Sequence, residues 1–294
     1  MNKVLNIGLI QTTLDSNIAW NSELRMNEFE AKRVWQEIKN GIVNLNIVAP
    51  TIKPQIIILP EFALPLEYEN ELVQISKTTG CVFIAGLDFI KSEFDDKKYI
   101  ENKAVVVIPN SWPTNKKSVY ASKIYFGKYF FSNLELHAFK DNFTPKPNEN
   151  MYIFDAGFYG NIGVAICADF FDIERFEVYK GRIHHMFVIA YNQDVNSFYF
   201  LAEAISRLVF CNVAICNTGY FGGSIVFSPY EKVYKRYVYK HEGGKLFTSQ
   251  VLSLPVKELD EFQNNKELSL DDKNRKFKSL PPNYRKIQLK TTSK

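Results

Sequence analysis

The stretch NIGVAICADFFD, residues 161–172, contains the two features that decide the fold, a buried strand and the turn that ends it. Residues 161–166 are mostly apolar and partly β-branched, as is typical of a buried strand. The chain turns polar after Cys167, and Asp172 is well placed to cap a short helix. Cys167 is therefore either a small buried residue or a nucleophile at a strand-to-helix turn, where free backbone N–H groups favour the thiolate.

Apolar runs of the same kind recur along the chain and alternate with longer amphipathic segments. The expected strands are KVLNIGLIQ (3–11), PQIIILP (54–60), CVFIAGLDFI (81–90), KAVVVIP (103–109), MFVIAY (186–191) and NVAICN (212–217). The expected helices are WNSELRMNEFEAKRVWQEIKN (20–40), EYENELVQISKTTG (67–80) and NSFYFLAEAISRLVF (196–210). Several strands are apolar at consecutive positions, so both of their faces must be covered. The pattern predicts an α/β protein with sheets between other layers.

The charge of the chain is concentrated near its C-terminus. The 294 residues have a formal net charge of +4, and residues 257–294 alone carry ten basic and six acidic side chains, which gives the same surplus. We expect one domain over residues 1–256, followed by a polar, basic tail over 257–294. The tail either wraps over the body or a neighbouring subunit, or is mobile. Only this tail favours nucleic-acid binding, so we do not expect a nucleic-acid partner.

The cysteines and the N-terminus indicate a cytoplasmic protein. There are four cysteines, at positions 81, 167, 211 and 216, without CxxC pairs, which fits free thiols in a reducing compartment. Apart from Cys167, we expect them to be small buried residues. No signal peptide and no run of about 18 apolar residues is evident. His184 and His185 are adjacent and would face opposite sides of a strand, so we expect no metal site.

Glu61 and Lys123 are two further residues with catalytic potential. Glu61 follows the buried run IIILP (56–60), at an edge where α/β sheets commonly carry catalytic groups. Lys123 lies among apolar and aromatic neighbours in VYASKIYFGKYFF (119–131), from which its ammonium could reach a developing oxyanion. Considered singly, Glu61 also fits an exposed loop acid, and Lys123 fits a lysine that extends to solvent from a strand end.

Taken together, Glu61, Lys123 and Cys167 resemble the catalytic residues of the carbon–nitrogen hydrolase (nitrilase) superfamily. Their spacings, 123 − 61 = 62 and 167 − 123 = 44, are similar to those of the family, as are the local contexts PE, K and GxxxC.D. The resemblance covers about residues 4–256, and its further matches are IGLIQ (7–11), GCVFIAGLDF (80–89) and NTGYFGGSIVFSP (217–229).

This resemblance implies a four-layer α-β-β-α sandwich, with two packed mixed sheets between outer helices. It also implies hydrolysis of an amide, an N-carbamoyl compound or, less often, a nitrile, without a metal or an organic cofactor. Glu61 would remove the thiol proton, and Cys167 would form a covalent thioester with the substrate. Lys123 and the backbone N–H of Ala168 would stabilise the oxyanion.

The resemblance suggests further site residues, each with an alternative role. Glu135, twelve positions after Lys123, is either the second glutamate that often supports the triad or a surface residue. Tyr125 and Phe130 either line the substrate pocket or belong to the core. Asn192 follows the next strand, where the specificity loop of the family would fall, and is a candidate for substrate contact.

The resemblance also implies partners, and one other class of function stays open. We expect a small amide or carbamoyl substrate, a homodimer or larger homo-oligomer, and no membrane association. The alternative is a regulatory or binding module that keeps the fold and works in a protein assembly. The helix segment SRLVFCN (206–212) leaves room for this alternative, because Phe210 replaces an acidic residue that is usual in the family.

Overall fold

Two six-stranded sheets form the centre of the computed structural model, which describes residues 3–47, 52–140, 142–265 and 275–287. The first sheet contains, in order, β15 (Thr248–Pro255), β1 (Val4–Gln11), β2 (Ile56–Ile58), β3 (Val82–Gly86), β6 (Lys103–Pro109) and β7 (Ala121–Gly127). The second contains β14 (Tyr237–Lys240), β13 (Ile225–Phe227), β12 (Asn212–Asn217), β11 (His185–Ala190), β10 (Asn161–Ile166) and β9 (Ile153–Asp155). Both are mixed, with parallel pairs at the centre and antiparallel pairs outside.

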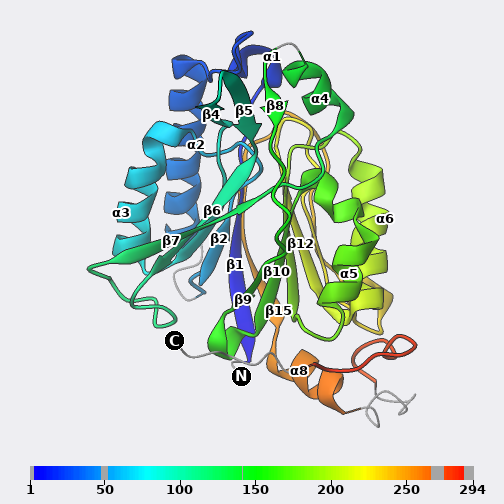
Figure 1. Ribbon diagram of the computed structural model, residues 1–294. Coiled ribbons are helices and arrows are strands. Elements are labelled where there is room, and N and C mark those ends of the chain that lie inside the picture. Colours follow the sequence, from blue (N-terminus) through cyan, green and yellow to red (C-terminus); the bar gives the residue numbers. More distant parts are fainter. Residues whose placement is uncertain (1–2, 48–51, 141, 266–274, 288–294) are drawn as a thin grey trace.

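Helices lie on the outer faces of both sheets (Figure 1). α2 (Glu28–Ile47) and α3 (Glu69–Thr79) lie outside the first sheet, and α5 (Ile173–Tyr179) and α6 (Val195–Ile205) lie outside the second. The expected four-layer α-β-β-α sandwich is therefore confirmed. α2 begins later than the sequence pattern suggested, because the Asn27 side chain accepts from the Phe29 N–H and caps the helix there.

Shorter elements complete the described part of the chain, in which no helix has the length and apolar character needed to span a membrane. A three-stranded sheet is formed by β4 (Ile90–Phe94), β5 (Lys97–Glu101) and β8 (Thr144–Pro145). The short helices are α1 (Ser16–Ala19), α4 (Asn133–Phe139), α7 (Val233–Arg236) and α8 (Lys257–Asn264). Single turns are the 3-10 helices η1 (Leu66–Tyr68), η2 (Gly157–Tyr159) and η3 (Cys167–Phe171) and the π-helical turn η4 (Ser206–Phe210).

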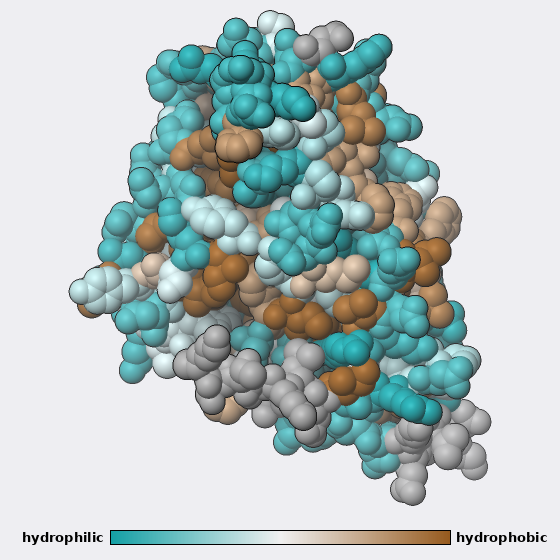
Figure 2. Space-filling model, in the orientation of Figure 1, coloured by the Kyte–Doolittle hydropathy of each residue, from teal (hydrophilic) through white to brown (hydrophobic). Residues whose placement is uncertain are grey.

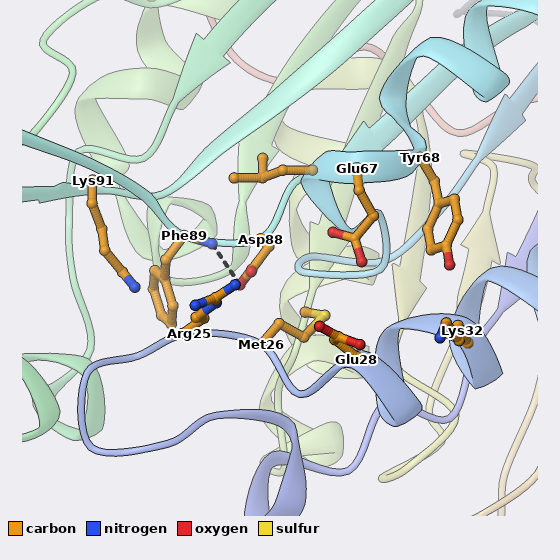
Figure 3. A pocket seen from close by; sticks show the side chains of 10 residues that line it. Arg25, Met26, Glu28, Lys32, Glu67, Tyr68, Asp88, Phe89 and Lys91 are labelled. Carbon is orange, nitrogen blue, oxygen red and sulfur yellow. Dashed lines mark hydrogen bonds between the residues drawn. The ribbon is translucent and has the colours of Figure 1, made fainter.

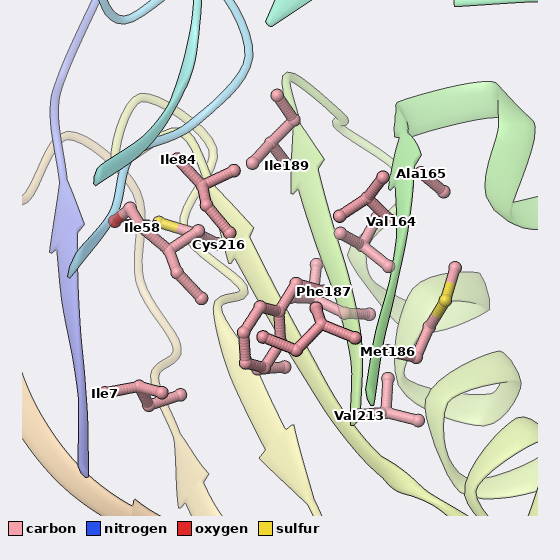
Figure 4. Packing of buried hydrophobic residues seen from close by; sticks show 14 of the residues in the cluster. Ile7, Ile58, Ile84, Val164, Ala165, Met186, Phe187, Ile189, Val213 and Cys216 are labelled. Carbon is pink, nitrogen blue, oxygen red and sulfur yellow. Dashed lines mark hydrogen bonds between the residues drawn. The ribbon is translucent and has the colours of Figure 1, made fainter. Parts of the chain in front are cut away.

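Consecutive apolar residues in the strands pack into different layers, because successive side chains of a strand point to opposite faces. Ile56 and Ile58 of β2 belong to the core between the two sheets, whereas Ile57 belongs to the cluster that contains Trp35 of α2. Figure 4 shows the inter-sheet core, in which residues from both sheets meet around Phe187. The run IIILP is apolar throughout because both faces of β2 are covered. Cys81, Cys167, Cys211 and Cys216 are free and buried.

The carboxyl ends of strands from both sheets meet at one end of the sandwich. The N–H of Tyr191, directly after β11, donates to the side chain of Glu61, which follows β2. β3 and β7 both pair antiparallel with β6, so they end on the same side of the sheet, at the end where β6 starts. α1, α4 and the three-stranded sheet lie over this end of the molecule (Figure 1). Residues that follow β2, β7, β10 and β11, or precede β6, are thus brought together.

The described part of the C-terminal segment packs on the body. It contributes to an apolar cluster of Phe210, Leu259, Phe262, Phe277 and Tyr284. Two basic residues of the segment, Arg275 and Lys278, each pair with Glu231 at 2.9 Å. For residues 275–287 the segment therefore wraps over the body, as one of the alternatives proposed. Residues 266–274 and 288–294 of the expected tail lie outside the described residues, and the boundary at residue 256 stays a prediction.

Asp260 of α8 fixes this segment through charge. His184 Nδ1 accepts from the Asn161 N–H, so Nε2 carries the proton and donates to Asp260 Oδ1 at 2.9 Å. Lys286 Nζ lies 3.2 Å from the same oxygen. The His184 hydrogen bond, helped by Lys286, lowers the pKa of Asp260 to about 2. We expect Asp260→Asn to reduce the free energy of unfolding at pH 7 by about 1 kcal/mol, measured by urea denaturation, because solvent screens this partly exposed carboxylate.

The pH dependence distinguishes this electrostatic role from simple packing. A carboxyl whose folded pKa is lowered contributes stability above its unfolded pKa, and that stability is lost as the pH falls through the folded value. The difference between Asp260→Asn and the wild type should therefore be constant near neutral pH and shrink as the pH falls from the unfolded pKa of 3.8 towards the folded pKa of about 2. Glu261→Gln is the matched control, because Glu261 is exposed and pairs with Lys257 at 3.8 Å. A pH-independent loss would contradict the interpretation.

Candidate active site

Glu61 is a buried acid at the junction of the two sheets. It is 1% exposed. The turn that carries Glu61 packs directly against Gly86 at the end of β3. Only glycine leaves room for this turn, since a Cβ on Gly86 would lie 2.5 Å from Glu61 Cα. Glu61 Oε1 accepts from Lys128 Nζ and Asn102 Nδ2, both at 2.8 Å. Its Oε2 accepts from the Tyr191 N–H, also at 2.8 Å. Both carboxylate oxygens are therefore held by donors from distant segments.

Lys128 directly follows β7 and is the buried cation of the site. Its side chain is 1% exposed, and its Nζ donates to Glu61 Oε1 at 2.8 Å and to Glu135 Oε2 at 2.6 Å. Burial by itself lowers the pKa of Lys128, but the carboxylates of Glu61 and Glu135 outweigh that effect and raise the pKa. Lys128 is therefore an ammonium throughout the neutral pH range. We call Glu61, Lys128 and Glu135 the acid–lysine cluster.

Glu135 is held in the cluster by the start of α4. Ser132 is the N-cap of this helix, and its hydroxyl accepts from the Glu135 N–H while Glu135 Oε2 accepts from the Ser132 N–H at 2.8 Å. This reciprocal capping box places the carboxylate back over the helix start. Its other oxygen, Oε1, accepts from Asn102 Nδ2 at 2.9 Å. Of the two alternatives for Glu135, the structure therefore shows the residue beside the lysine and not on an exposed surface.

Cys167 begins η3 directly after β10 and keeps 8% of its surface exposed. Its φ of 47° lies in the left-handed region, which is strained for a residue with a side chain and is often found at active sites. Burial, Glu61 and Glu135 raise the pKa of Cys167, while Lys128 and the Tyr191 N–H act in the opposite direction. The net pKa lies well above the ordinary value, because burial and the two carboxylates outweigh the effects that favour the thiolate. The resting group is a thiol.

Lys123 is not part of this site. It lies in the middle of the edge strand β7, and its half-exposed side chain pairs with Glu69 of α3 at 2.8 Å. The prediction that Lys123 joins Glu61 and Cys167 is therefore wrong, and Lys128 occupies that place. The physical reason is the position of each lysine along the strand. Side chains within β7 point to the two faces of the sheet, whereas a residue directly after β7 lies at the carboxyl ends of the strands, where Glu61 also lies.

The other site residues predicted from the sequence do not all lie near the acid–lysine cluster. Tyr125 donates its hydroxyl proton to Glu69 beside Lys123, away from the acid–lysine cluster. Phe130 is 44% exposed, so it does not belong to the core. Asn192 Nδ2 donates to the Asp194 carbonyl at 2.9 Å, within its own loop. Ala168 is half-buried directly after Cys167, where its backbone was expected. The structure thus does not bring Tyr125 to the site, and contact of Phe130 and Asn192 with substrate stays a prediction.

Asn102, Asp169 and Tyr191 are site residues that sequence reasoning missed. Asp169 Oδ1 accepts from the N–H groups of Tyr129 and Phe130, at 3.1 and 2.9 Å. It therefore ties the turn after Cys167 to the loop after Lys128. The available signal was their position in the sequence: Asn102 directly precedes the predicted strand 103–109, Tyr191 is the last residue of the predicted strand 186–191, and Asp169 lies two positions after Cys167.

A separate cavity of about 620 Å³ lies between the start of α2, η1 and the segment that follows β3 (Figure 3). It is lined by Arg25, Met26, Glu28, Lys32, Leu66, Glu67, Tyr68, Asp88, Phe89 and Lys91. Burial raises the pKa of Asp88 to about 6, although the Trp20 indole and the Phe89 N–H both donate to it. The lining contains neither Cys167 nor any member of the acid–lysine cluster. We therefore do not assign this cavity to the nucleophile.

Comparison with known proteins identifies the fold through structure and not through sequence. No family model and no curated protein matches the chain. An amidase from Nesterenkonia sp. is similar with a TM-score of 0.59 and 14% identity, over 89% of this chain and 94% of that chain. Nit3 from Saccharomyces cerevisiae, a member of branch 10 of the nitrilase superfamily, gives 0.60 and 15%, over 90% and 94%. The fold is therefore that of the nitrilase superfamily.

A third neighbour extends this likeness over nearly the whole of both chains. XC1258 from Xanthomonas campestris, a CN-hydrolase superfamily protein, has a TM-score of 0.60 and 11% identity, over 93% of this chain and 98% of that chain. At these identities the likeness concerns the fold. The superfamily resemblance drawn from the sequence is thus confirmed at the level of architecture.

Proposed function

We propose that this protein is a cysteine-dependent carbon–nitrogen hydrolase that acts on a small amide or N-carbamoyl compound, with nitriles as a secondary substrate class. The observation that carries the proposal is the buried Lys128 ammonium, which binds two carboxylates beside the Cys167 thiol. A buried charge cluster of this kind at the carboxyl ends of strands lowers the stability of the fold and is typical of active sites. The neighbouring fold supports the proposal, because solved forms of the Nesterenkonia amidase include one with the acetamide moiety of fluoroacetamide covalently added at the active-site cysteine.

The first half of the reaction follows from the protonation states. Since Cys167 rests as a thiol, its proton must leave as sulfur attacks, and Glu61 is the base positioned to take it. An S–C bond forms, and the carbonyl π electrons move to oxygen. Lys128 uses two of its three N–H donors on Glu61 and Glu135, which leaves one for this oxyanion. The Ala168 N–H is the second candidate donor.

The second half restores the free enzyme. The oxyanion collapses, the C–N bond breaks, and the nitrogen leaves with the proton that Glu61 took from sulfur. Water then attacks the thioester, Glu61 accepts one water proton, and the S–C bond breaks so that sulfur is reprotonated. The balance is one amide plus one water giving one acid plus one amine or ammonia. Proton transfer by a positioned group of this kind contributes about 10²–10⁴-fold in rate.

The test is a panel of amides, ureas and N-carbamoyl compounds, with ammonia release and the intact protein mass as readouts. We expect the wild type to turn over at least one class and to form an adduct equal to the acyl or carbamoyl group. Cys167→Ala should show neither, and Cys81→Ala, which removes a buried thiol far from the acid–lysine cluster, should retain both. If the wild type and Cys167→Ala behave identically throughout, the regulatory or binding module becomes the better interpretation.

For assembly and location we propose a cytoplasmic homodimer or larger homo-oligomer. The outer face formed by α5, α6 and the turns beside them exposes Phe171, Ile173, Phe200 and Leu208, with exposed fractions of 53%, 81%, 76% and 56%. Figure 2 shows apolar surface on the side of the molecule where α6 lies. An apolar face of this kind is typical of an interface. The four free cysteines support a reducing compartment.

A further inference from the structure

Asn102 is a buried amide that contacts every member of the acid–lysine cluster. It directly precedes β6 and is 2% exposed. Its Nδ2 donates to Glu61 Oε1 at 2.8 Å and to Glu135 Oε1 at 2.9 Å. Its backbone carbonyl accepts from the Lys128 N–H at 2.9 Å. One residue therefore holds both carboxylates and the segment that carries the ammonium.

The orientation of this amide is dictated by its neighbours. Turning the amide over would direct its oxygen at two carboxylate oxygens, so the NH2 group must face Glu61 and Glu135. In this orientation Asn102 Oδ1 is buried and has no hydrogen-bond partner within the described residues. An unsatisfied buried carbonyl destabilises a fold. An asparagine that carries this penalty and contacts both carboxylates indicates a role in the site and not in packing.

The two carboxylate oxygens of Glu61 accept different numbers of hydrogen bonds. Oε1 accepts two hydrogen bonds, from Lys128 and Asn102, whereas Oε2 accepts one, from the Tyr191 N–H. A carboxylate oxygen has about two acceptor sites, so Oε1 is filled and Oε2 keeps one free. The same Tyr191 N–H lowers the pKa of the Cys167 thiol, which places this N–H group near the sulfur. Oε2 is therefore the oxygen on the sulfur side and the one able to accept a proton.

We propose that Asn102 is a positioning residue of the active site. Together with Lys128 it saturates Glu61 Oε1, so that the proton of Cys167 moves to Oε2 and returns from Oε2 to the departing nitrogen. The same amide sets the separation of Glu61 and Glu135 on either side of Lys128. This inference rests on the proposed hydrolase function and adds the assignment of the working oxygen and the residue that enforces it.

Two substitutions separate positioning from general support of the fold. Asn102→Leu keeps the size but removes both donors, which frees Oε1 to compete for the proton. We expect kcat to fall about 100-fold, the lower range for a positioned proton carrier, with KM changed less than about threefold. Asn115→Gly is the control: it removes another asparagine whose Oδ1 is buried and unpartnered, near the opposite end of β2. It should leave kcat within about twofold.

Asn102→Asp supplies a readout that a structural role would not move. The groups that face Glu61 are Lys128 after β7, Glu135 on α4 and Cys167 at η3, so an added carboxylate gives three acids around one ammonium. Repulsion favours protonation of the acids. The acidic limb of the kcat/KM profile should move to higher pH by about one unit or more. Alkylation of Cys167 by iodoacetamide, which needs no turnover, should shift to higher pH as well.

These experiments distinguish failure of the Asn102 inference from failure of the proposed hydrolase function. An Asn102→Leu variant with kcat within threefold of the wild type, or an Asn102→Asp variant with both pH profiles unmoved, overturns the inference. A wild type that hydrolyses nothing in the panel, while the alkylation profile of Asn102→Asp still shifts, overturns the proposed function instead. Urea unfolding midpoints and the titrated Cys167 thiol correct each rate for the fraction of folded protein.

Discussion

Lys128→Met should abolish most of the activity and weaken the fold strongly. Methionine has nearly the length of lysine but leaves Glu61 and Glu135 buried without their shared cation. Removing one partner of a buried charge cluster destabilises by about 3–5 kcal/mol, and loss of an oxyanion donor together with the displaced base should lower kcat/KM on the order of 10³-fold. Urea denaturation and hydrolysis of the best amide in the panel measure the two effects.

The pH dependence of this stabilisation has a definite sign. The folded pKa of Lys128 is raised, so its contribution is fully present below the pKa of an unfolded lysine and is lost only as the pH rises through the folded value. The full effect of Lys128→Met should therefore be seen at neutral pH.

Lys123→Met is the matched control, because the same change is made five residues earlier on β7. The Lys123 ion pair with Glu69 is partly exposed, and such pairs contribute about 0–1 kcal/mol. We expect activity within about twofold of the wild type. Equal losses in the two variants, or a larger loss for Lys123→Met, would show that the buried lysine is not the functional one.

The contrast between these lysines shows which part of the site was readable from sequence. Glu61 and Cys167 could be located because each follows an apolar run that both layers of the sandwich require to be buried. Lys123 and Lys128 both lie among aromatic residues, so local composition could not separate them. The two lysines differ because β7 ends at Gly127. Lys128 therefore lies at the carboxyl ends of the strands beside Glu61, whereas Lys123 lies within the strand.

The rest of the site depends on contacts that are far apart in sequence. Asn102 is 41 residues from Glu61 and 33 from Glu135, and before β6 it looks like any polar residue at a strand start. The strongly raised pKa of Cys167 could not be predicted from the sequence for a related reason. The N–H groups of its turn are local and readable, whereas burial and the charges of Glu61 and Glu135 are set by tertiary structure and outweigh them.

Glu61→Gln should therefore have two opposite effects at one site. Turnover should fall by about 10²–10⁴-fold, because the amide cannot accept the proton of the attacking thiol. The thiol itself should become more acidic, since burial remains but one of the two carboxylates that raise the pKa of Cys167 is gone, while Lys128 still lowers it. Alkylation by iodoacetamide at pH 7 should accordingly be faster than in the wild type, although the variant is nearly inactive.

This pairing of results separates general-base catalysis by Glu61 from a loss of packing around it. A variant that merely disturbs packing would lose turnover without a directed shift of the alkylation profile to lower pH. Glu69→Gln is the matched control, because Glu69 binds Lys123 and Tyr125 outside the acid–lysine cluster, and both readouts should stay near the wild-type values. Normal turnover in Glu61→Gln would remove Glu61 from the mechanism, and slower alkylation would mean that its charge does not act on the sulfur.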